Sequence, residues 1–147
     1  MDDSGFEEPI RILLVEDNPG DVRLVREAFD QVSAETSIQA VTDGADALES
    51  LRERRSADAS LPDLVLLDLN LPRVDGFSVL EAIEADPRLA RIPCIILTGS
   101  SAREDVRKSY ELAANTYLTK PSDPDEFASL ASSIEKFWFR HAVLPPA

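Results

Sequence analysis

The feature that most constrains the fold is a regular alternation of short apolar runs with longer amphipathic stretches. Five apolar runs occur along the chain, and each is followed by a segment in which apolar side chains recur every three or four residues. Short apolar runs are typical of buried strands, whereas a period of 3.6 residues is typical of helices that cover a sheet. Five successive β-α pairs therefore predict an α/β domain, doubly wound around a five-stranded parallel sheet.

The predicted elements divide the chain into three parts. Strands are expected at residues 10–16, 37–41, 63–68, 94–98 and 116–119, and helices at 19–31, 44–54, 76–85, 102–113 and 124–140. The third and fourth strands are almost entirely apolar, as expected at the centre of a sheet covered on both faces. Residues 1–9 are expected to be a flexible acidic segment, residues 10–140 the domain, and residues 141–147 a tail.

Several helix starts carry capping residues. Asn18 and Asp123 each precede a proline, which is the favoured order of N-cap and first helical residue. Ser101 followed by Glu104 is a capping-box pattern. The last helix should turn one apolar stripe toward the core, formed by Phe127, Leu130, Ala131, Ile134, Phe137 and Trp138. Phe139 falls off that stripe, where an exposed aromatic residue often marks a partner surface.

Length, charge and cysteine content exclude several classes of protein. The 147 residues suffice for one core, and a formal net charge of −13 repels the phosphate backbone of DNA or RNA. No apolar run approaches the roughly 18 residues of a membrane span, and the N-terminus has no secretion signal. The chain is therefore expected to be cytoplasmic and to contact no membrane. Cys94 is the single cysteine, so no intramolecular disulfide can form.

Polar residues lie at the ends of four predicted strands. Glu16 and Asp17 follow the first strand, Asp68 ends the third, Thr98 ends the fourth, and Lys120 follows the fifth. In a doubly wound sheet the carboxyl ends of the strands meet at one rim, near the topological switch point. We therefore expect three carboxylates, a hydroxyl and a lysine to face one another at that rim.

This group of side chains predicts phosphoryl chemistry. Clustered carboxylates repel one another, so such a site must raise their pKa values or bind a cation. Mg²⁺ fits because it prefers oxygen ligands and uses one or two protein carboxylates together with phosphate oxygens. A carboxylate can also attack phosphorus and form an acyl phosphate, provided that the charge of the incoming group is neutralised. Mg²⁺ and Lys120 could neutralise that charge, and Thr98 could donate a hydrogen bond to a phosphoryl oxygen.

The segments that carry these residues resemble the receiver domain of two-component response regulators. There are four such segments: Ile12 to Asp17, Pro62 to Pro72, Thr98-Gly99 and Lys120-Pro121. The resemblance extends over roughly residues 10 to 140 and implies a flavodoxin-like sheet with strand order 2-1-3-4-5. Gly99 departs slightly from the family pattern, which more commonly has alanine there.

The resemblance also implies roles for the acidic residues. Asp68 would be the phosphoacceptor. Mg²⁺ would be held by the side chains of Glu16, Asp17 and Asp68 and by the backbone carbonyl of Asn70. Lys120 would contact the phosphoryl group and assist its transfer.

Two further residues would form a conformational switch by the same resemblance. Thr98 would move toward the phosphoryl group, and Tyr117 would follow by rotating from an exposed to a buried position. The Lys120-Pro121 peptide bond would be cis.

A receiver domain signals rather than turning over a substrate. A sensor histidine kinase or phosphotransfer protein would supply the phosphoryl group, and an unidentified protein target would bind the phosphorylated form. The extra aromatic residue Phe139 leaves open a homodimer through the fourth helix, fifth strand and fifth helix. The loop at 55–62 and the C-terminal segment at 137–145 resemble the corresponding segments of single-domain regulators that serve phytochrome-type sensor kinases.

Three other classes share parts of this pattern. An aspartyl-phosphate hydrolase usually needs a second aspartate two residues after its nucleophile, where this chain has Asn70. A phosphate-independent interaction domain would be expected to have lost Asp68, Lys120 or the acidic pair, and none is lost. A flavin-binding domain needs a phosphate loop after the first strand, where Glu16 and Asp17 would repel phosphate.

Overall fold

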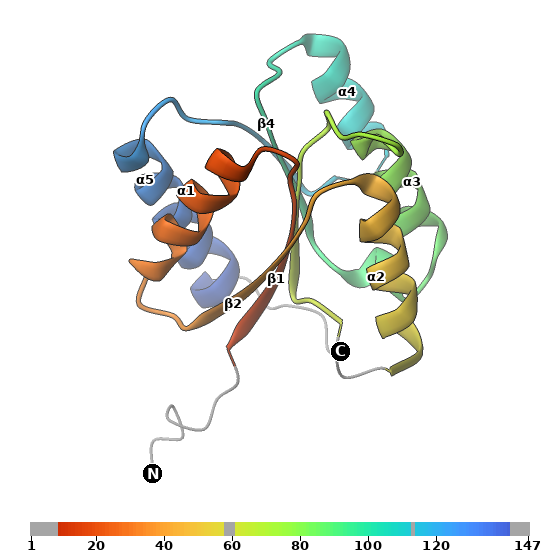
Figure 1. Ribbon diagram of the computed structural model, residues 1–147, viewed down its shortest axis with the longest axis horizontal. Helices are drawn as coiled ribbons and strands as arrows, with labels where there is room; N and C mark the ends of the chain where they lie inside the picture. Colours follow the sequence, from red (N-terminus) through yellow and green to blue (C-terminus); the bar gives the residue numbers. More distant parts are fainter. Residues whose placement is uncertain (1–8, 58–60, 113, 142–147) are drawn as a thin grey trace.

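The computed structural model describes residues 9–57, 61–112 and 114–141. The segment expected at 1–9 and the tail expected at 141–147 therefore lie almost entirely outside the described residues. In the described part, strands and helices alternate along the chain, with one helix after each strand (Figure 1).

The strands form one parallel sheet in the order β2-β1-β3-β4-β5, which confirms the predicted fold class. Val15 pairs with Leu67, and Leu67 pairs with Ile96, so the ends of the three central strands are nearly level. The residues that follow these strands are therefore neighbours. The strands are β1 (Ile10–Val15), β2 (Thr36–Val41), β3 (Leu64–Leu67), β4 (Cys94–Thr98) and β5 (Thr116–Thr119).

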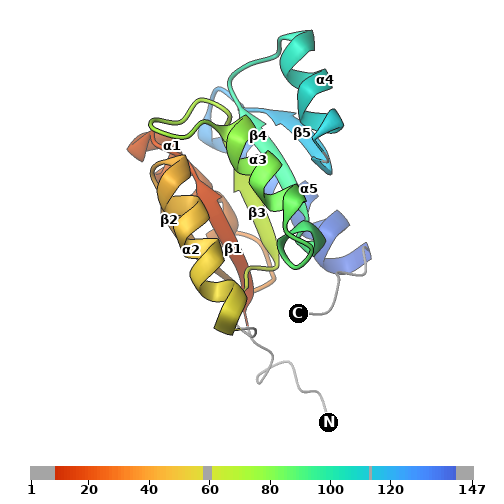
Figure 2. The same ribbon diagram turned by 90° about the vertical axis from the view of Figure 1, so that its right-hand side faces the viewer.

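Helices cover both faces of the sheet. Helices α1 and α5 lie together on one face, and α2, α3 and α4 lie on the other (Figures 1 and 2). The helices are α1 (Pro19–Asp30), α2 (Gly44–Ala57), α3 (Gly76–Ala85), α4 (Arg103–Glu111) and α5 (Pro124–Ile134), with short helical turns η2 (Leu89–Arg91) and η3 (Glu135–His141). No helix in this described part combines the length and apolar character that a membrane span needs.

Alternate strand residues point into two separate cores. Leu13 and Val15 of β1 pack into the core beneath α2 and α3, whereas Ile12 and Leu14 pack into the core beneath α1 and α5. Every residue of β3 and β4 is buried, as predicted for central strands. The Cys94 thiol is also buried, and burial raises its pKa to about 12, so it is an unreactive core side chain.

The predicted helix starts are confirmed at α1 and α5 but not at α4. The side chains of Asn18 and Asp123 cap their helices by accepting hydrogen bonds from backbone N–H groups three residues later. The capping box from Ser101 does not form, because α4 begins at Arg103 after an uncapped residue. Ser100 contacts this end of the helix instead: its Oγ donates to Asp105 Oδ2 at 2.5 Å and accepts from the Ala102 backbone N–H.

The ends of two helices differ from the sequence prediction. Helix α2 continues to Ala57, so the first residues of the loop expected at 55–62 are helical. After α5 the chain continues as the π-helical turn η3 rather than as an α-helix to residue 140. The wider turn changes which side chains face inward. Phe137, expected in the core-facing stripe, is 57% exposed. The side chain of Phe139 lies outside the described part.

No peptide bond among the described residues is cis, so the bond between Lys120 and Pro121 is trans. The expectation of a cis bond was wrong. Trans is the isomer that a bond before proline adopts unless its surroundings select the other one.

Candidate functional site

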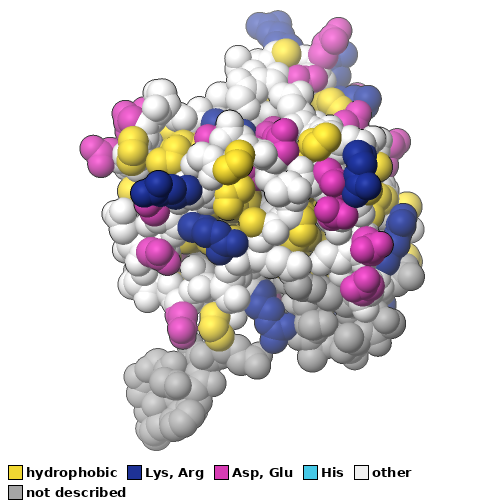
Figure 3. Space-filling view, in the orientation of Figure 1, with side chains coloured by type: hydrophobic (Ala, Val, Ile, Leu, Met, Phe, Trp, Pro, Cys, Tyr) yellow, Lys and Arg dark blue, Asp and Glu magenta, His cyan; other side chains and the backbone are white. Residues whose placement is uncertain are grey.

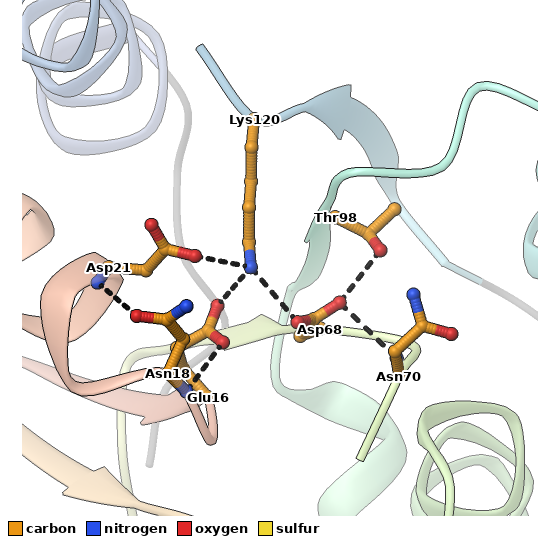
Figure 4. A network of polar contacts seen from close by, with 7 residues as sticks. All are labelled: Glu16, Asn18, Asp21, Asp68, Asn70, Thr98 and Lys120. Carbon is orange, nitrogen blue, oxygen red and sulfur yellow. Dashed lines mark hydrogen bonds and ion pairs between the residues drawn. The ribbon is translucent and has the colours of Figure 1, made fainter. Parts of the chain in front are cut away.

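The carboxyl ends of four strands bring the predicted side chains together. Glu16 follows β1, Asp68 follows β3, Thr98 ends β4 and Lys120 follows β5. Figure 4 shows Lys120 and Thr98 both pointing at the Asp68 carboxylate. The predicted gathering of these residues at one rim is therefore confirmed.

Both carboxylate oxygens of Asp68 are engaged. Oδ1 accepts hydrogen bonds from Thr98 Oγ1 at 2.7 Å and from the Asn70 backbone N–H at 3.3 Å. Oδ2 accepts a hydrogen bond from Lys120 Nζ at 3.0 Å. The residue is only 4% exposed. These contacts hold the carboxylate in one orientation, with its charge directed at the rim.

The Lys120 ammonium contacts three carboxylates. Its Nζ lies 2.7 Å from Glu16 Oε1, 2.8 Å from Asp21 Oδ2 and 3.0 Å from Asp68 Oδ2. Burial acts to lower the pKa of Lys120, but its hydrogen bonds to the three carboxylates outweigh burial and raise that pKa above its ordinary value. The ammonium therefore keeps its positive charge throughout the physiological pH range.

Among the carboxyl groups of the described residues, Glu16 has the most strongly shifted pKa. Burial is the largest cause and raises the pKa of Glu16 to about 7, and the neighbouring charge of Asp68 acts in the same direction. The hydrogen bond from Lys120 lowers this pKa but does not compensate for burial. A buried carboxyl beside a second carboxylate gains from a further cation, because the cation favours its ionised form.

The acidic residues fit a divalent-metal site. Glu16, Asp17 and Asp68 each offer one carboxylate oxygen, and the three oxygens lie within 4.8 Å of one another. Glu16 and Asp68 are buried, whereas Asp17 is exposed and leaves an approach from solvent. An all-oxygen set of this kind suits Mg²⁺. Asn70 lies beside Asp68, and its carbonyl as a further ligand stays a prediction.

A cleft opens next to the metal-site residues. It has a volume of about 410 Å³, and its lining includes Asp17, Asn70, Phe77 and Asp105. An incoming phosphoryl donor could reach the rim through this cleft.

Mg²⁺ should stabilise the folded protein more at about pH 7.5 than at about pH 5.5. The pKa of Glu16 is raised from 4.5 to about 7 in the folded state, so the folded protein holds the Glu16 proton more tightly than the unfolded chain does. Without metal, the stabilisation from this protonated carboxyl group is complete below pH 4.5. That contribution is lost as the pH rises to about 7. The cation binds the ionised carboxylate and so restores stability where it was lost. Thermal unfolding at both pH values, with and without millimolar MgCl₂, measures the difference.

The Glu16→Gln variant is the control for this measurement. Its amide does not titrate, so the gain in melting temperature from Mg²⁺ should become smaller and nearly independent of pH. An equal gain at both pH values in the natural chain would contradict the assignment of the raised pKa to Glu16.

The two predicted switch residues lie on neighbouring strands, Thr98 at the end of β4 and Tyr117 within β5. Thr98 is fully buried at the end of β4 and donates to Asp68. Tyr117 is partly buried, and its hydroxyl donates to the Ser100 carbonyl at 2.7 Å. Burial raises the pKa of the Tyr117 hydroxyl. The backbone N–H of Tyr117 donates to the Tyr110 hydroxyl at 3.1 Å. The predicted rotation of Tyr117 stays a prediction.

Asp21 is a residue of the site that the strand-end pattern did not predict. Asp21 lies in the first turn of α1, and its backbone N–H is capped by Asn18 Oδ1 at 3.1 Å. The capping pattern at Asn18-Pro19 could have indicated this residue, because it places Asp21 in the first turn of the helix that follows the rim.

The fold and this site define a class of small α/β domains in which a buried carboxylate lies between a lysine, a hydroxyl and a divalent-metal cluster. The model of the response regulator receiver domain matches residues 12–132. The chain belongs to this family, which confirms the resemblance noted in its sequence.

Two relatives match nearly the full length of the chain. Response regulator Rcp1 of Synechocystis sp. is 41% identical over 140 residues, which cover 95% of each chain. The probable methanogenesis regulatory protein FilR2 of Methanothrix harundinacea is 39% identical, over 90% of this chain and 85% of that protein.

Solved structures of response regulators share the fold. The phosphorylated cyanobacterial phytochrome response regulator RcpA matches with a TM-score of 0.87 and 41% identity, over 95% of this chain and all of that one (100%). The Mn²⁺-bound form of Rcp1 matches with a TM-score of 0.84 and 40% identity, over 94% and 100%. Receiver domains bind Mg²⁺ at acidic residues, and Glu16, Asp17 and Asp68 form the acidic cluster of this chain.

Proposed function

We propose that Asp68 accepts a phosphoryl group from the phosphohistidine of a sensor histidine kinase or phosphotransfer protein. The observation that carries this proposal is the buried Asp68 carboxylate, fixed between Thr98 and Lys120 beside the metal-site residues. One carboxylate oxygen attacks phosphorus, a new O–P bond forms, and the P–N bond to the donor imidazole breaks. The product is an acyl phosphate on the protein.

Lys120 and Thr98 assist this transfer from two sides. The permanently charged Lys120 ammonium offsets negative charge on the phosphoryl oxygens. The Thr98 hydroxyl, which now donates to Asp68 Oδ1, can turn its donor to a phosphoryl oxygen. Mg²⁺, held by Glu16, Asp17, Asp68 and the Asn70 carbonyl, would supply further charge neutralisation for the transferred group.

The phosphorylated state is transmitted through Thr98 and Tyr117. Movement of Thr98 toward the phosphoryl group pulls on the loop after β4, whose Ser100 carbonyl holds the Tyr117 hydroxyl. Breaking that hydrogen bond frees Tyr117 to rotate inward, which changes the surface of α4 and β5. A signal of this kind needs only two packing arrangements of similar free energy.

A phytochrome-type sensor kinase is the proposed donor. Support comes from the likeness to RcpA, a phytochrome response regulator. We place the exchange in the cytoplasm, where ATP is available to charge the kinase, and assign the receiver to residues 10–140. The downstream target is a protein rather than a nucleic acid. In support, the chain has a net charge of −13, and Figure 3 shows basic side chains dispersed among acidic ones.

A homodimer through α4, β5 and α5 is part of the proposal. Tyr110 is 49% exposed and Phe137 is 57% exposed, and both lie on these elements or directly after them. An apolar groove of about 290 Å³ adjoins Phe137, lined by Ile95, Leu118, Leu130, Ile134 and Trp138 among others. Exposed apolar surface on this side favours contact with a second copy.

A hydrolase is the less favoured alternative. Hydrolysis of an aspartyl phosphate in such enzymes uses a general acid two residues after the nucleophile, and Asn70 cannot supply a proton in that way.

The proposed function is tested by incubating the chain with acetyl phosphate and Mg²⁺. We expect the intact mass to rise by one phosphoryl group, and the gain to be removed by a chelator and by hydroxylamine, which cleaves acyl phosphates. Light scattering of both forms then measures whether phosphorylation promotes the dimer. A chain that gains no phosphoryl group from either acetyl phosphate or a charged histidine kinase would refute the proposal.

A further inference from the structure

Asp21 contacts the lysine of the site from outside the metal cluster. Its Oδ2 accepts a hydrogen bond from Lys120 Nζ at 2.8 Å. Among the described residues, the cluster that could hold a metal consists of Glu16, Asp17 and Asp68, so Asp21 is not part of it. We infer that Asp21 is a positioning residue that anchors the Lys120 ammonium while the phosphoryl group is transferred to Asp68. This inference rests on the proposed function.

The hydrogen-bond donors of the ammonium identify the anchor. Lysine has three N–H donors, and here they meet Glu16, Asp21 and Asp68. Two of these acceptors would change during the proposed reaction: Glu16 would share its charge with a bound Mg²⁺, and Asp68 would use an oxygen to bond phosphorus. Asp21 is the acceptor whose bonding stays the same. It can therefore hold the ammonium while another donor turns to a phosphoryl oxygen.

The position of Asp21 suits this role. Its backbone is fixed in the first turn of α1 by the cap from Asn18, and its side chain is 24% exposed. Figure 4 shows Asp21 and Asp68 on opposite sides of the Lys120 ammonium. An anchor on the far side restricts the long lysine side chain without blocking the approach to Asp68.

A purely structural role for Asp21 predicts different behaviour. An acidic residue in the first turn of a helix stabilises that helix through its dipole, without any effect on a lysine. Asp125 is an exposed acidic residue in the first turn of α5 and serves as the matched control. Asp125→Asn removes the same charge from the same kind of position, whereas the carboxylates bonded to Lys120 are those of Glu16, Asp21 and Asp68.

The first test observes the ammonium directly and needs no phosphorylation. The chain has three lysines, Lys108, Lys120 and Lys136, so its ¹H–¹⁵N ammonium spectrum is simple. Hydrogen-bonded, poorly exposed Lys120 should exchange slowly with water and give a cross-peak. We expect that cross-peak to broaden or vanish in Asp21→Asn, to persist in Asp125→Asn, and to return at least partly in Asp21→Glu.

The second test measures phosphorylation by acetyl phosphate at saturating Mg²⁺. Loss of one charge-assisted hydrogen bond that positions Lys120 should slow the maximal rate in Asp21→Asn by at least about five-fold. In a Lys120→Met background the same substitution should have no further effect, because the group that it positions is gone.

Two results would overturn the inference. One is an Asp21→Asn protein with the natural cross-peak and rate. The other is a rate loss from Asp21→Asn that is as large with Met at position 120 as with lysine. If the natural chain accepts no phosphoryl group, the proposed function fails, whereas the ammonium spectrum still decides whether Asp21 anchors Lys120.

Discussion

An Asp68→Asn protein should take up no measurable phosphoryl group from acetyl phosphate, even at saturating Mg²⁺. An amide oxygen carries no formal charge and is a poor nucleophile, so we expect the rate to fall by at least about a thousand-fold, as when an enzyme loses its nucleophile. The fold should persist, because Thr98 can still donate to the amide oxygen and Lys120 keeps its contacts with Glu16 and Asp21.

Intact-protein mass after incubation measures the loss, and the natural chain and Asp125→Asn provide the controls. Both should gain one phosphoryl group, since Asp125 is exposed and lies on α5. A full mass gain in Asp68→Asn would mean that another residue accepts the phosphoryl group. Reduction with borohydride and peptide mapping of the natural chain would then identify that residue.

Gly76→Ala should lower the free energy of unfolding by about 3 kcal/mol, because overpacking against backbone is not easily relieved. Gly76 begins α3, immediately after its N-cap Asp75. A Cβ added there would lie 2.4 Å from the Asp68 carbonyl oxygen and 2.5 Å from Leu69 Cα. Both are backbone atoms, so the methyl group must push α3 away from the end of β3. The displacement would move Asp68 itself, and phosphorylation should slow as well.

Gly99→Ala is the matched control for that substitution. Apart from Gly99 itself and its two neighbours in the chain, no residue has a heavy atom within 4 Å of a Cβ added to Gly99, so the methyl group meets open space. Alanine also reduces the conformational freedom of the unfolded chain, so we expect no loss of stability and a gain of up to about 1 kcal/mol. Urea unfolding of the two variants measures the contrast. Equal stabilities would show that α3 can shift freely against β3.

The fold was predictable because its elements have strong periodic signals. The apolar runs at β4 and β5 gave the observed bounds of those strands, and strand order followed from the resemblance. The helix ends were less predictable where two side chains compete. Ser100 rather than Ser101 bonds to the first turn of α4, through Asp105, and the expected cap at Ser101 does not form. The change to a π-helical turn after α5 has no composition signal, and it turned Phe137 outward.

The site was predictable as far as strand ends determine it. Parallel strands of similar register bring Glu16, Asp68, Thr98 and Lys120 to one rim whatever the details of packing. The contact between Asp21 and Lys120 depends instead on how α1 is rotated about its axis. The raised pKa of Glu16 depends on how deeply the first loop is buried. Neither rotation nor depth can be obtained from residue spacing.

The hydroxyl of Tyr110 also has a consequence for self-association. β5 is an edge strand, and the unpaired backbone donors of an edge strand can add a strand from another molecule, which is a route to aggregation. On this edge the Tyr110 hydroxyl accepts a hydrogen bond from the backbone N–H of Tyr117, so that donor is paired. A movement of Tyr117 that breaks this contact would expose the donor for as long as the acyl phosphate lasts. The chain would then be most prone to irreversible strand pairing while its signal is on.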